Sequence, residues 1–351
     1  MVMALLLPFV SLVYFCQKRS DPAYQIRKNS KMKIKFWGVR GSIPSSMTTE
    51  QWAQHFKNLM VEFFRVGNSA ASQIDAFLGK KSLPQIGGYG TGTTCVEVSD
   101  SGKSLIIDCG SGLKNLNDSL VQSGAIKTLN EYHILMSHFH LDHIMGMPFF
   151  TPHFFKGKTI HYYSVQKETE SIVRQMFAKP TFPITFESLQ ANIKFHTIRP
   201  YEKVTIQDFD VTAYQLDHPD PCYGFRVEKN AKAYGHAIDH EAIRTSMAQL
   251  GLDGGLFKNI QLLYFDAQYT ESQMTQKQGW GHGTCDRGFQ VAANFGVEQI
   301  LFAHHDPSAD LQAIDQQKKD AQVILQEKFP ELVKAKSFKW DYAFEGQAVE
   351  I

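Results

Sequence analysis

The chemically richest stretch of the chain is the run His138–His143, H-F-H-L-D-H, which places three imidazoles and one carboxylate within six positions. Imidazole nitrogens and carboxylate oxygens are preferred ligands of zinc and other first-row divalent metals, and a catalytic site leaves one coordination position open for water. A single histidine would carry little information, but this spacing is typical of metal sites. The run therefore predicts a metal centre.

The metal-binding run must be positioned by the apolar segment before it, Tyr132–Met136, which has the length and composition of a strand buried on both faces. In layered α/β folds, ligands collect where strands end. Four later apolar segments also end in aspartate or histidine. The residues at these ends are Asp217-His218, Asp239-His240, Asp266, and His304-His305-Asp306. Each is ordinary alone, but together they supply what a two-metal site still lacks.

Composition and charge describe an ordinary soluble globular protein. Of the 351 residues, 43% are hydrophobic and 20% are charged, and 36 lysines and arginines nearly balance 35 aspartates and glutamates. No overall basic field attracts long nucleic acid, so the balance favours a small substrate and argues against a stable nucleic-acid complex. Five cysteines without a C-x-x-C pair indicate neither a disulfide framework nor a structural zinc knuckle.

Residues 1–31 form an apolar N-terminal extension whose role the sequence leaves open. Met1–Phe15 is shorter than the roughly 20 residues of a spanning helix, and it lacks the basic region and cleavage site of a secretory signal. Three readings remain: a start misassigned ahead of Met32, a membrane anchor through residues 1–16, or a lipoprotein signal ending at Cys16. We expect a cytoplasmic protein, with membrane anchoring as the alternative.

The expected globular domain spans residues 32–351 and carries a helical insertion at about 46–85. Within this insertion, apolar residues recur at alternating spacings of four and three, the period of an amphipathic helix. They are Trp52, Phe56, Leu59, Phe63 and Val66. We therefore treat 46–85 as an addition to one large α/β domain.

The His138–His143 run, the later strand-end residues and the segments Phe36–Ser42 (F-W-G-V-R-G-S) and Gly279–His282 (G-W-G-H) together resemble the metallo-β-lactamase-fold hydrolases. The branch they resemble contains ribonuclease Z and phosphodiesterases. The resemblance covers nearly everything from Met32 to Ile351. It implies an α/β fold of the αββα sandwich type, with two mixed β-sheets packed face to face and helices outside.

The resemblance also implies a ligand set for two divalent ions. One ion is expected on His138, His140 and His218, the other on Asp142, His143 and His304, with Asp239 bridging both. By the same alignment, His304 is preferred over His305, and Asp239 over Asp217 and His240. Zinc is the default for a nitrogen-rich set, with Mn²⁺ or Fe²⁺ as alternatives.

A further pair bears on the reaction. Asp266 and the later His282 are similar to the ribonuclease Z-like pair in which an acidic residue orients a histidine that protonates the leaving group. Positioned acid catalysis is worth roughly a hundred- to ten-thousand-fold. The resemblance thus implies three catalytic residues: His282 as acid, Asp266 as its orienter, and Asp142 chiefly as a ligand. Gly283 departs from the usual serine and Asp266 from the common glutamate. The alternative is that His282 caps a helix beginning near Thr284.

The expected function is a binuclear metal-dependent phosphodiesterase acting on a small phosphodiester such as a cyclic nucleotide. In this mechanism a hydroxide between the two metals attacks phosphorus while His282 protonates the departing oxygen. The runner-up is a ribonuclease Z-like RNA endonuclease. A lactonase or thioesterase on the same fold and a non-catalytic metal-binding sensor are further alternatives, because glyoxalase II shares the ligand set. Whether the chain is a monomer or a homodimer stays open.

Overall fold

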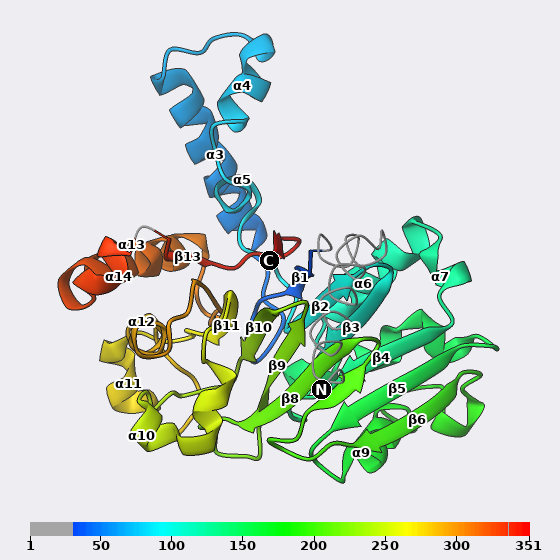
Figure 1. Cartoon of the computed structure of the whole chain (residues 1–351). Coiled ribbons are helices and arrows are strands. Elements are labelled where there is room, and N and C mark those ends of the chain that lie inside the picture. The colour runs from blue at the N-terminus through cyan, green and yellow to red at the C-terminus, as the bar shows by residue number, and fades with distance from the viewer. Residues whose placement is uncertain (1–30, 336) are drawn as a thin grey trace, which may run out of the picture.

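The computed structural model describes residues 31–335 and 337–351, so nearly all of the predicted N-terminal extension lies outside the described residues. Two seven-stranded sheets form its centre (Figure 1). The first has the order β14 (Ala348–Glu350), β1 (Lys33–Gly38), β2 (Cys95–Asp100), β3 (Lys103–Ile107), β4 (Glu131–Leu135), β5 (Thr159–Ser164) and β6 (Asn192–Thr197).

The second sheet runs in the order β13 (Lys339–Tyr342), β12 (Gln299–Ala303), β11 (Leu262–Asp266), β10 (Lys232–Ala237), β9 (Tyr223–Lys229), β8 (Phe209–Gln215) and β7 (Val204–Ile206). Strands β10 to β13 are parallel, whereas β7 to β10 pair antiparallel. Both sheets are therefore mixed, as predicted, since the first also combines antiparallel β1–β2–β3 with parallel β3 to β6.

Buried side chains divide the molecule into layers. One cluster joins the inner faces of the two sheets and includes Phe36, Leu135, Phe225 and Tyr264. A second cluster lies between the first sheet and helix α6 (Gly112–Gln122). A third lies between the second sheet and the helices that cover it. The order helix, sheet, sheet, helix confirms the predicted αββα sandwich.

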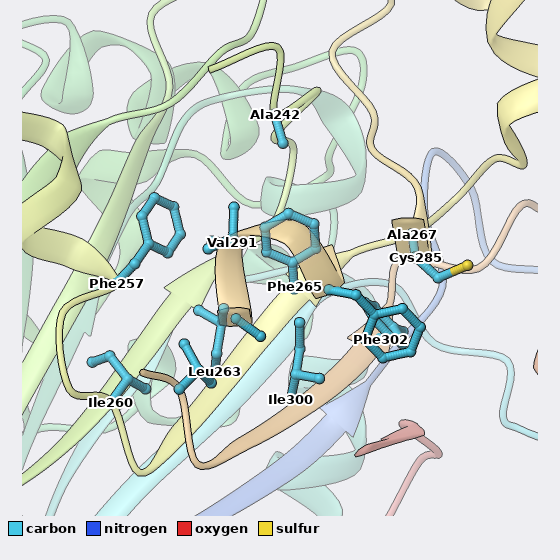
Figure 2. Packing of buried hydrophobic residues seen from close by; sticks show 14 of the residues in the cluster. Ala242, Phe257, Ile260, Leu263, Phe265, Ala267, Cys285, Val291, Ile300 and Phe302 are labelled. Atoms are coloured by element: carbon cyan, nitrogen blue, oxygen red, sulfur yellow. The ribbon is translucent and has the colours of Figure 1, made fainter. Parts of the chain in front are cut away.

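Helix α12 (Cys285–Phe295) illustrates how sequence sets this outer packing. Its first turn is capped by Thr284, whose hydroxyl accepts the Arg287 N–H at 3.3 Å, and it ends at Gly296 in the left-handed region at φ 68°. Figure 2 shows Val291 of this helix close to Leu263, Phe265, Ile300 and Phe302 of the second sheet. This contact fixes the strands whose ends carry the candidate site.

The remaining helices are mostly short. They are α7 (Ala125–Thr128), α8 (Leu141–Ile144), α9 (Thr169–Met176), α10 (Met247–Leu250), α11 (Glu271–Lys277), α13 (Leu311–Lys328) and α14 (Pro330–Lys334). Three others, α3 (Thr49–Arg65), α4 (Ile74–Leu78) and α5 (Leu83–Gly87), form an arm that projects from the sandwich (Figure 1). Among the described helices, none combines the length and apolarity needed to cross a bilayer.

Strand direction explains why distant residues meet. Strands β8, β10, β11 and β12 of the second sheet point the same way, and the chain continues from each end into a predicted site residue. On the first sheet, β3 and β4 are parallel and end beside each other. The ends of all these strands thus gather at one edge of the sandwich, which is where α/β folds collect ligands.

Candidate metal centre

The structure brings the predicted metal ligands into two adjoining groups. In the first, His138, His140, His218 and Asp239 each offer one nitrogen or oxygen, and these atoms lie within 4.8 Å of one another. In the second, Asp142, His143 and His304 do the same. All seven candidate residues therefore belong to one of two groups that could hold a metal ion.

Asp239 lies between the two groups. Its Oδ2 is 2.7 Å from Nε2 of His143, and its Oδ1 is 3.3 Å from Nε2 of His304. Oδ2 of Asp142 lies 3.4 Å from the first of these nitrogens and 3.5 Å from the second. Although burial opposes ionisation of Asp239, the surrounding imidazoles hold its pKa well below the usual value. A buried carboxylate in this position suits a shared, anionic ligand.

Unpartnered polar atoms test whether a metal fits here. Five buried atoms of the two groups lack a hydrogen bond of acceptable geometry: Nε2 of His138, His143, His218 and His304, and Oδ2 of Asp239. Two of these atoms, Nε2 of His143 and Oδ2 of Asp239, nevertheless lie only 2.7 Å apart. Burying polar atoms without partners is costly, and native proteins rarely do so. Converging lone pairs of nitrogen and oxygen are what a divalent cation requires, so the residues present fit a metal centre.

In each candidate imidazole, one ring nitrogen contacts a protein oxygen. This contact fixes which of the two nitrogens faces the centre. In four of them Nδ1 contacts a protein oxygen: His138 with Ser137 Oγ at 3.2 Å, His143 with Asp108 Oδ2 at 2.9 Å, His218 with the Asp220 carbonyl at 2.9 Å, and His304 with Thr94 Oγ1 at 3.3 Å. His140 is the reverse, because its Nε2 contacts Asp220 Oδ2 at 2.8 Å. Hence Nε2 is free in four rings and Nδ1 in His140. Such backing is usual for metal-binding histidines.

Asp108 is a functional residue that sequence reasoning missed. Besides His143, its carboxylate accepts the backbone N–H and the hydroxyl of Ser137, both at 2.8 Å. Burial by itself raises the pKa of Asp108, but the neighbouring His143 and His236 lower it far more, so the group is ionised. The available signal was its position directly after strand β3, the same signal that marked the other strand ends.

Asp142 is fixed by the segment between β1 and α3. Its Oδ2 accepts the backbone N–H of Ser42 at 2.8 Å. Next to Ser42, Gly41 lies against His304, since a Cβ added there would be 2.4 Å from the Cδ2 atom of that ring. These contacts explain why the short segment Phe36–Ser42 accompanies the metal-binding run, although sequence alone did not assign it a role.

The residues weighed against the predicted ligands have other partners. Nε2 of His305 donates to the Ala343 carbonyl oxygen at 2.7 Å. Oδ1 of Asp217 accepts the Nε–H of Arg244 at 2.6 Å. Nδ1 of His240 accepts the backbone N–H of Asp217 at 3.0 Å. None of the three belongs to the two converging groups.

His282 adjoins the centre and is paired with Asp266. Nδ1 of His282 lies 3.0 Å from Asp266 Oδ2 and 3.6 Å from Asp239 Oδ1. Burial lowers the pKa of His282, but the Asp266 carboxylate and the more distant Asp239 and Asp142 raise it to about 9. Helix α12 is capped by Thr284, so capping does not account for His282.

The structure also explains the glycine at 283. A Cβ added there would lie 2.7 Å from the His240 carbonyl oxygen and 2.8 Å from that of Asp266. The Gly283 N–H instead donates to Asp266 Oδ1 at 3.0 Å. The two chain segments approach too closely here for a side chain.

Comparisons with known proteins identify the family and the fold. Residues 103–305 match the family described as "Beta-lactamase superfamily domain". Ribonuclease Z of Streptococcus suis (strain 98HAH33) is 24% identical over 275 residues, which cover 63% of this chain and 85% of that protein.

Two solved structures share the fold. The metallo-β-lactamase fold protein YhfI from Bacillus subtilis has a TM-score of 0.55 and 16% identity, over 92% of this chain and 100% of that one. The short form of human tRNase Z has a TM-score of 0.54 and 15% identity, over 90% of this chain and 98% of that one.

Proposed function

We propose, from the premise that this chain belongs to the β-lactamase superfamily, that this metal-dependent hydrolase is a binuclear phosphodiesterase acting on a small phosphodiester such as a cyclic nucleotide. The observation that carries the proposal is the His282–Asp266 pair beside the converging ligands. Cleaving a phosphodiester expels an alkoxide, which leaves poorly unless it is protonated. A positioned imidazole at the edge of the centre supplies that proton.

In the proposed centre His138, His140 and His218 would hold one ion, and Asp142, His143 and His304 would hold the other, with Asp239 available to both. Bound divalent ions supply a hydroxide nucleophile at neutral pH and offset the negative charge that develops on the phosphoryl group. Zn²⁺ suits the nitrogen-rich set, while Mn²⁺ or Fe²⁺ suits its oxygen-containing half.

Three side chains, His282, Asp266 and Asp142, have separate roles in the proposed reaction. Asp266 accepts Nδ1–H of His282, so the opposite nitrogen, Nε2, carries the proton that passes to the departing oxygen. A pKa raised to about 9 keeps His282 protonated at neutral pH before the charge of the ions is added. The Ser42 N–H orients Asp142, whose role as a base is secondary to its role as a ligand.

A ribonuclease Z-like RNA endonuclease is the second candidate, and the Streptococcus suis ribonuclease Z relative supports it. The balanced charge, 36 basic against 35 acidic residues, favours the smaller substrate because long RNA binding depends on neutralising many phosphates. Both candidates share phosphodiester cleavage and differ in what surrounds the scissile bond.

A substrate panel tests the proposal. The full chain loaded with Zn²⁺ would be assayed on bis(p-nitrophenyl) phosphate, adenosine 3′,5′-cyclic monophosphate, a precursor tRNA and a lactone, before and after chelation. We expect diester cleavage that chelation abolishes and Zn²⁺ restores. If a lactone turns over while every diester is untouched with metal bound, the proposal fails.

The variant His282→Ala separates acid catalysis from metal binding. It should lower turnover of the cyclic nucleotide by about a hundredfold or more while leaving metal content unchanged. His55→Ala, a histidine on helix α3, is the matched control and should behave as the wild type. Equal loss of turnover and metal in His282→Ala would assign this residue a structural role.

A further inference from the structure

The loop Gly279–His282 leads from helix α11 into the candidate acid and exposes a large aromatic side chain. Trp280 is 56% exposed. Its flanking residues Gly279 and Gly281 both lie in the left-handed region, at φ 81° and 88°. An exposed indole offers a flat aromatic surface on which another ring can stack.

Buried contacts hold this loop in place. The Gly279 N–H donates to Oε2 of Glu241 at 2.9 Å, and Glu241 is only 2% exposed. Gly281 packs against the candidate ligand His218, because a Cβ added at Gly281 would lie 2.2 Å from the Cδ2 atom of that ring. The indole is therefore presented from a fixed backbone at the edge of the metal centre.

The surroundings of Trp280 suit a planar ligand. The ammonium of Lys277 lies over the indole, 4.1 Å from the ring centroid, and 4.8 Å from the centroid of Tyr269, whose ring is 5.6 Å from that of His282. A cation and an exposed aromatic surface thus stand together beside the candidate acid.

A pocket adjoins the same loop. It has a volume of about 490 Å³ and is lined by His218, Glu241, Ile243, Arg244 and Gly279, among others. Ligand pockets of roughly 300–1,000 Å³ accommodate small organic molecules. The pocket is therefore of the size that a nucleoside requires. It is lined by the candidate metal ligand His218 and by Gly279, the residue before Trp280.

We propose that Trp280 is a specificity-determining residue on which the nucleobase of the substrate stacks, on the indole face opposite the ammonium of Lys277. This inference rests on the proposed function, since it assigns the substrate class of that site as nucleotides. Stacking of a base on an aromatic side chain is worth about 1–3 kcal/mol and tolerates any base, because every base has a π-face.

Binding of paired product analogues tests the inference without relying on turnover. Calorimetric titration would give the Kd of the Zn²⁺-loaded full chain for adenosine 5′-monophosphate and for ribose 5-phosphate, which differ only in the base. We expect the wild type to bind the nucleotide at least tenfold more tightly. Trp280→Ala should bring the ratio of the two Kd values close to one, and Trp280→Phe should keep most of it. Phe56→Ala, which removes an exposed aromatic side chain on helix α3, should leave the ratio unchanged.

The inference is overturned if the wild type binds both compounds equally or if Trp280→Ala keeps the ratio. Hydrolysis of bis(p-nitrophenyl) phosphate by the same preparations distinguishes this failure from failure of the proposed function. If that diester is cleaved, the phosphodiesterase stands and only the base-stacking role is lost. If no diester is cleaved with metal bound, the proposed function itself fails.

Discussion

Oδ2 of Asp266 faces Nδ1 of His282 at 3.0 Å, and the same oxygen accepts the backbone N–H of Asp239 at 3.1 Å. The other oxygen, Oδ1, accepts the N–H groups of Gln268 and Gly283, each at 3.0 Å. One buried carboxylate thus connects the candidate acid to the backbone of the candidate bridging ligand. A change at Asp266 is expected to act on proton transfer through the orientation of His282.

Replacing Asp266 by asparagine should separate these roles. The asparagine oxygen can still accept the Asp239 N–H, but its NH2 group then faces the N–H groups of Gln268 and Gly283. The side chain also loses the charge that favours protonated His282. We expect turnover of a cyclic nucleotide to fall by about a hundredfold with metal content within error of the wild type. Turnover and metal analysis on the same preparation check this; loss of both ions would contradict it.

The rate should fall at alkaline pH through deprotonation of His282. Its pKa is raised to about 9, and the charge of bound cations lowers it from there, so the acid is present below that pKa and lost as the pH rises through it. We expect this alkaline decline for a diester with an alkyl leaving group. It should be weak for p-nitrophenolate, which leaves without protonation, and absent from His282→Ala.

Asp108→Asn should weaken metal binding. Oδ2 of Asp108 accepts a hydrogen bond from Nδ1 of His143 at 2.9 Å, which fixes the nitrogen of that ring that faces the centre. Loss of such backing typically costs about ten- to a hundredfold in metal affinity. Competition with a chromophoric chelator measures this. Asp118→Asn, at an exposed pair with Lys114, is the control, and equal affinities of the two variants would refute the prediction.

His304→Ala and His305→Ala should behave differently although they are neighbours in sequence. His304 belongs to the converging group, whereas His305 has its Nε2 2.7 Å from the Ala343 carbonyl. We expect the first variant to bind fewer ions per chain and the second to keep its ions with a lower melting temperature. Metal analysis and thermal unfolding of both variants measure this difference. Loss of ions in His305→Ala but not in His304→Ala would assign His305 to the centre.

Gly283→Ser should destabilise the protein. The added Cβ would lie 2.7 Å and 2.8 Å from two carbonyl oxygens, so the backbone around Asp266 has to shift. Overpacking of this kind costs about 1–3 kcal/mol in the free energy of unfolding. Denaturant unfolding measures the loss. Gly87→Ser is the control, because no atom lies within 4 Å of a Cβ added there and its backbone, like that of Gly283, is outside the left-handed region.

Much of the fold and of the candidate site was predictable because the signals are local. Apolar segments such as 132–136 and 299–303 follow the period and length of buried strands, and polar residues after them mark strand ends. Ligand chemistry is likewise a property of residue type, so the His138–His143 run indicated a metal on its own. Resemblance to a known family supplied the sandwich and the pairing of ligands with ions.

Other features depend on contacts between residues far apart in the chain, and spacing does not encode these. Ser42 reaches Asp142 across a hundred positions, and Thr94 reaches His304 across two hundred and ten. Sequence therefore specified which side chains are able to bind a metal and where strands end. The packing of two sheets selected the nitrogen that each imidazole presents, turned His305 away from the centre and excluded a side chain at Gly283, because orientation is fixed by neighbours that only folding brings together.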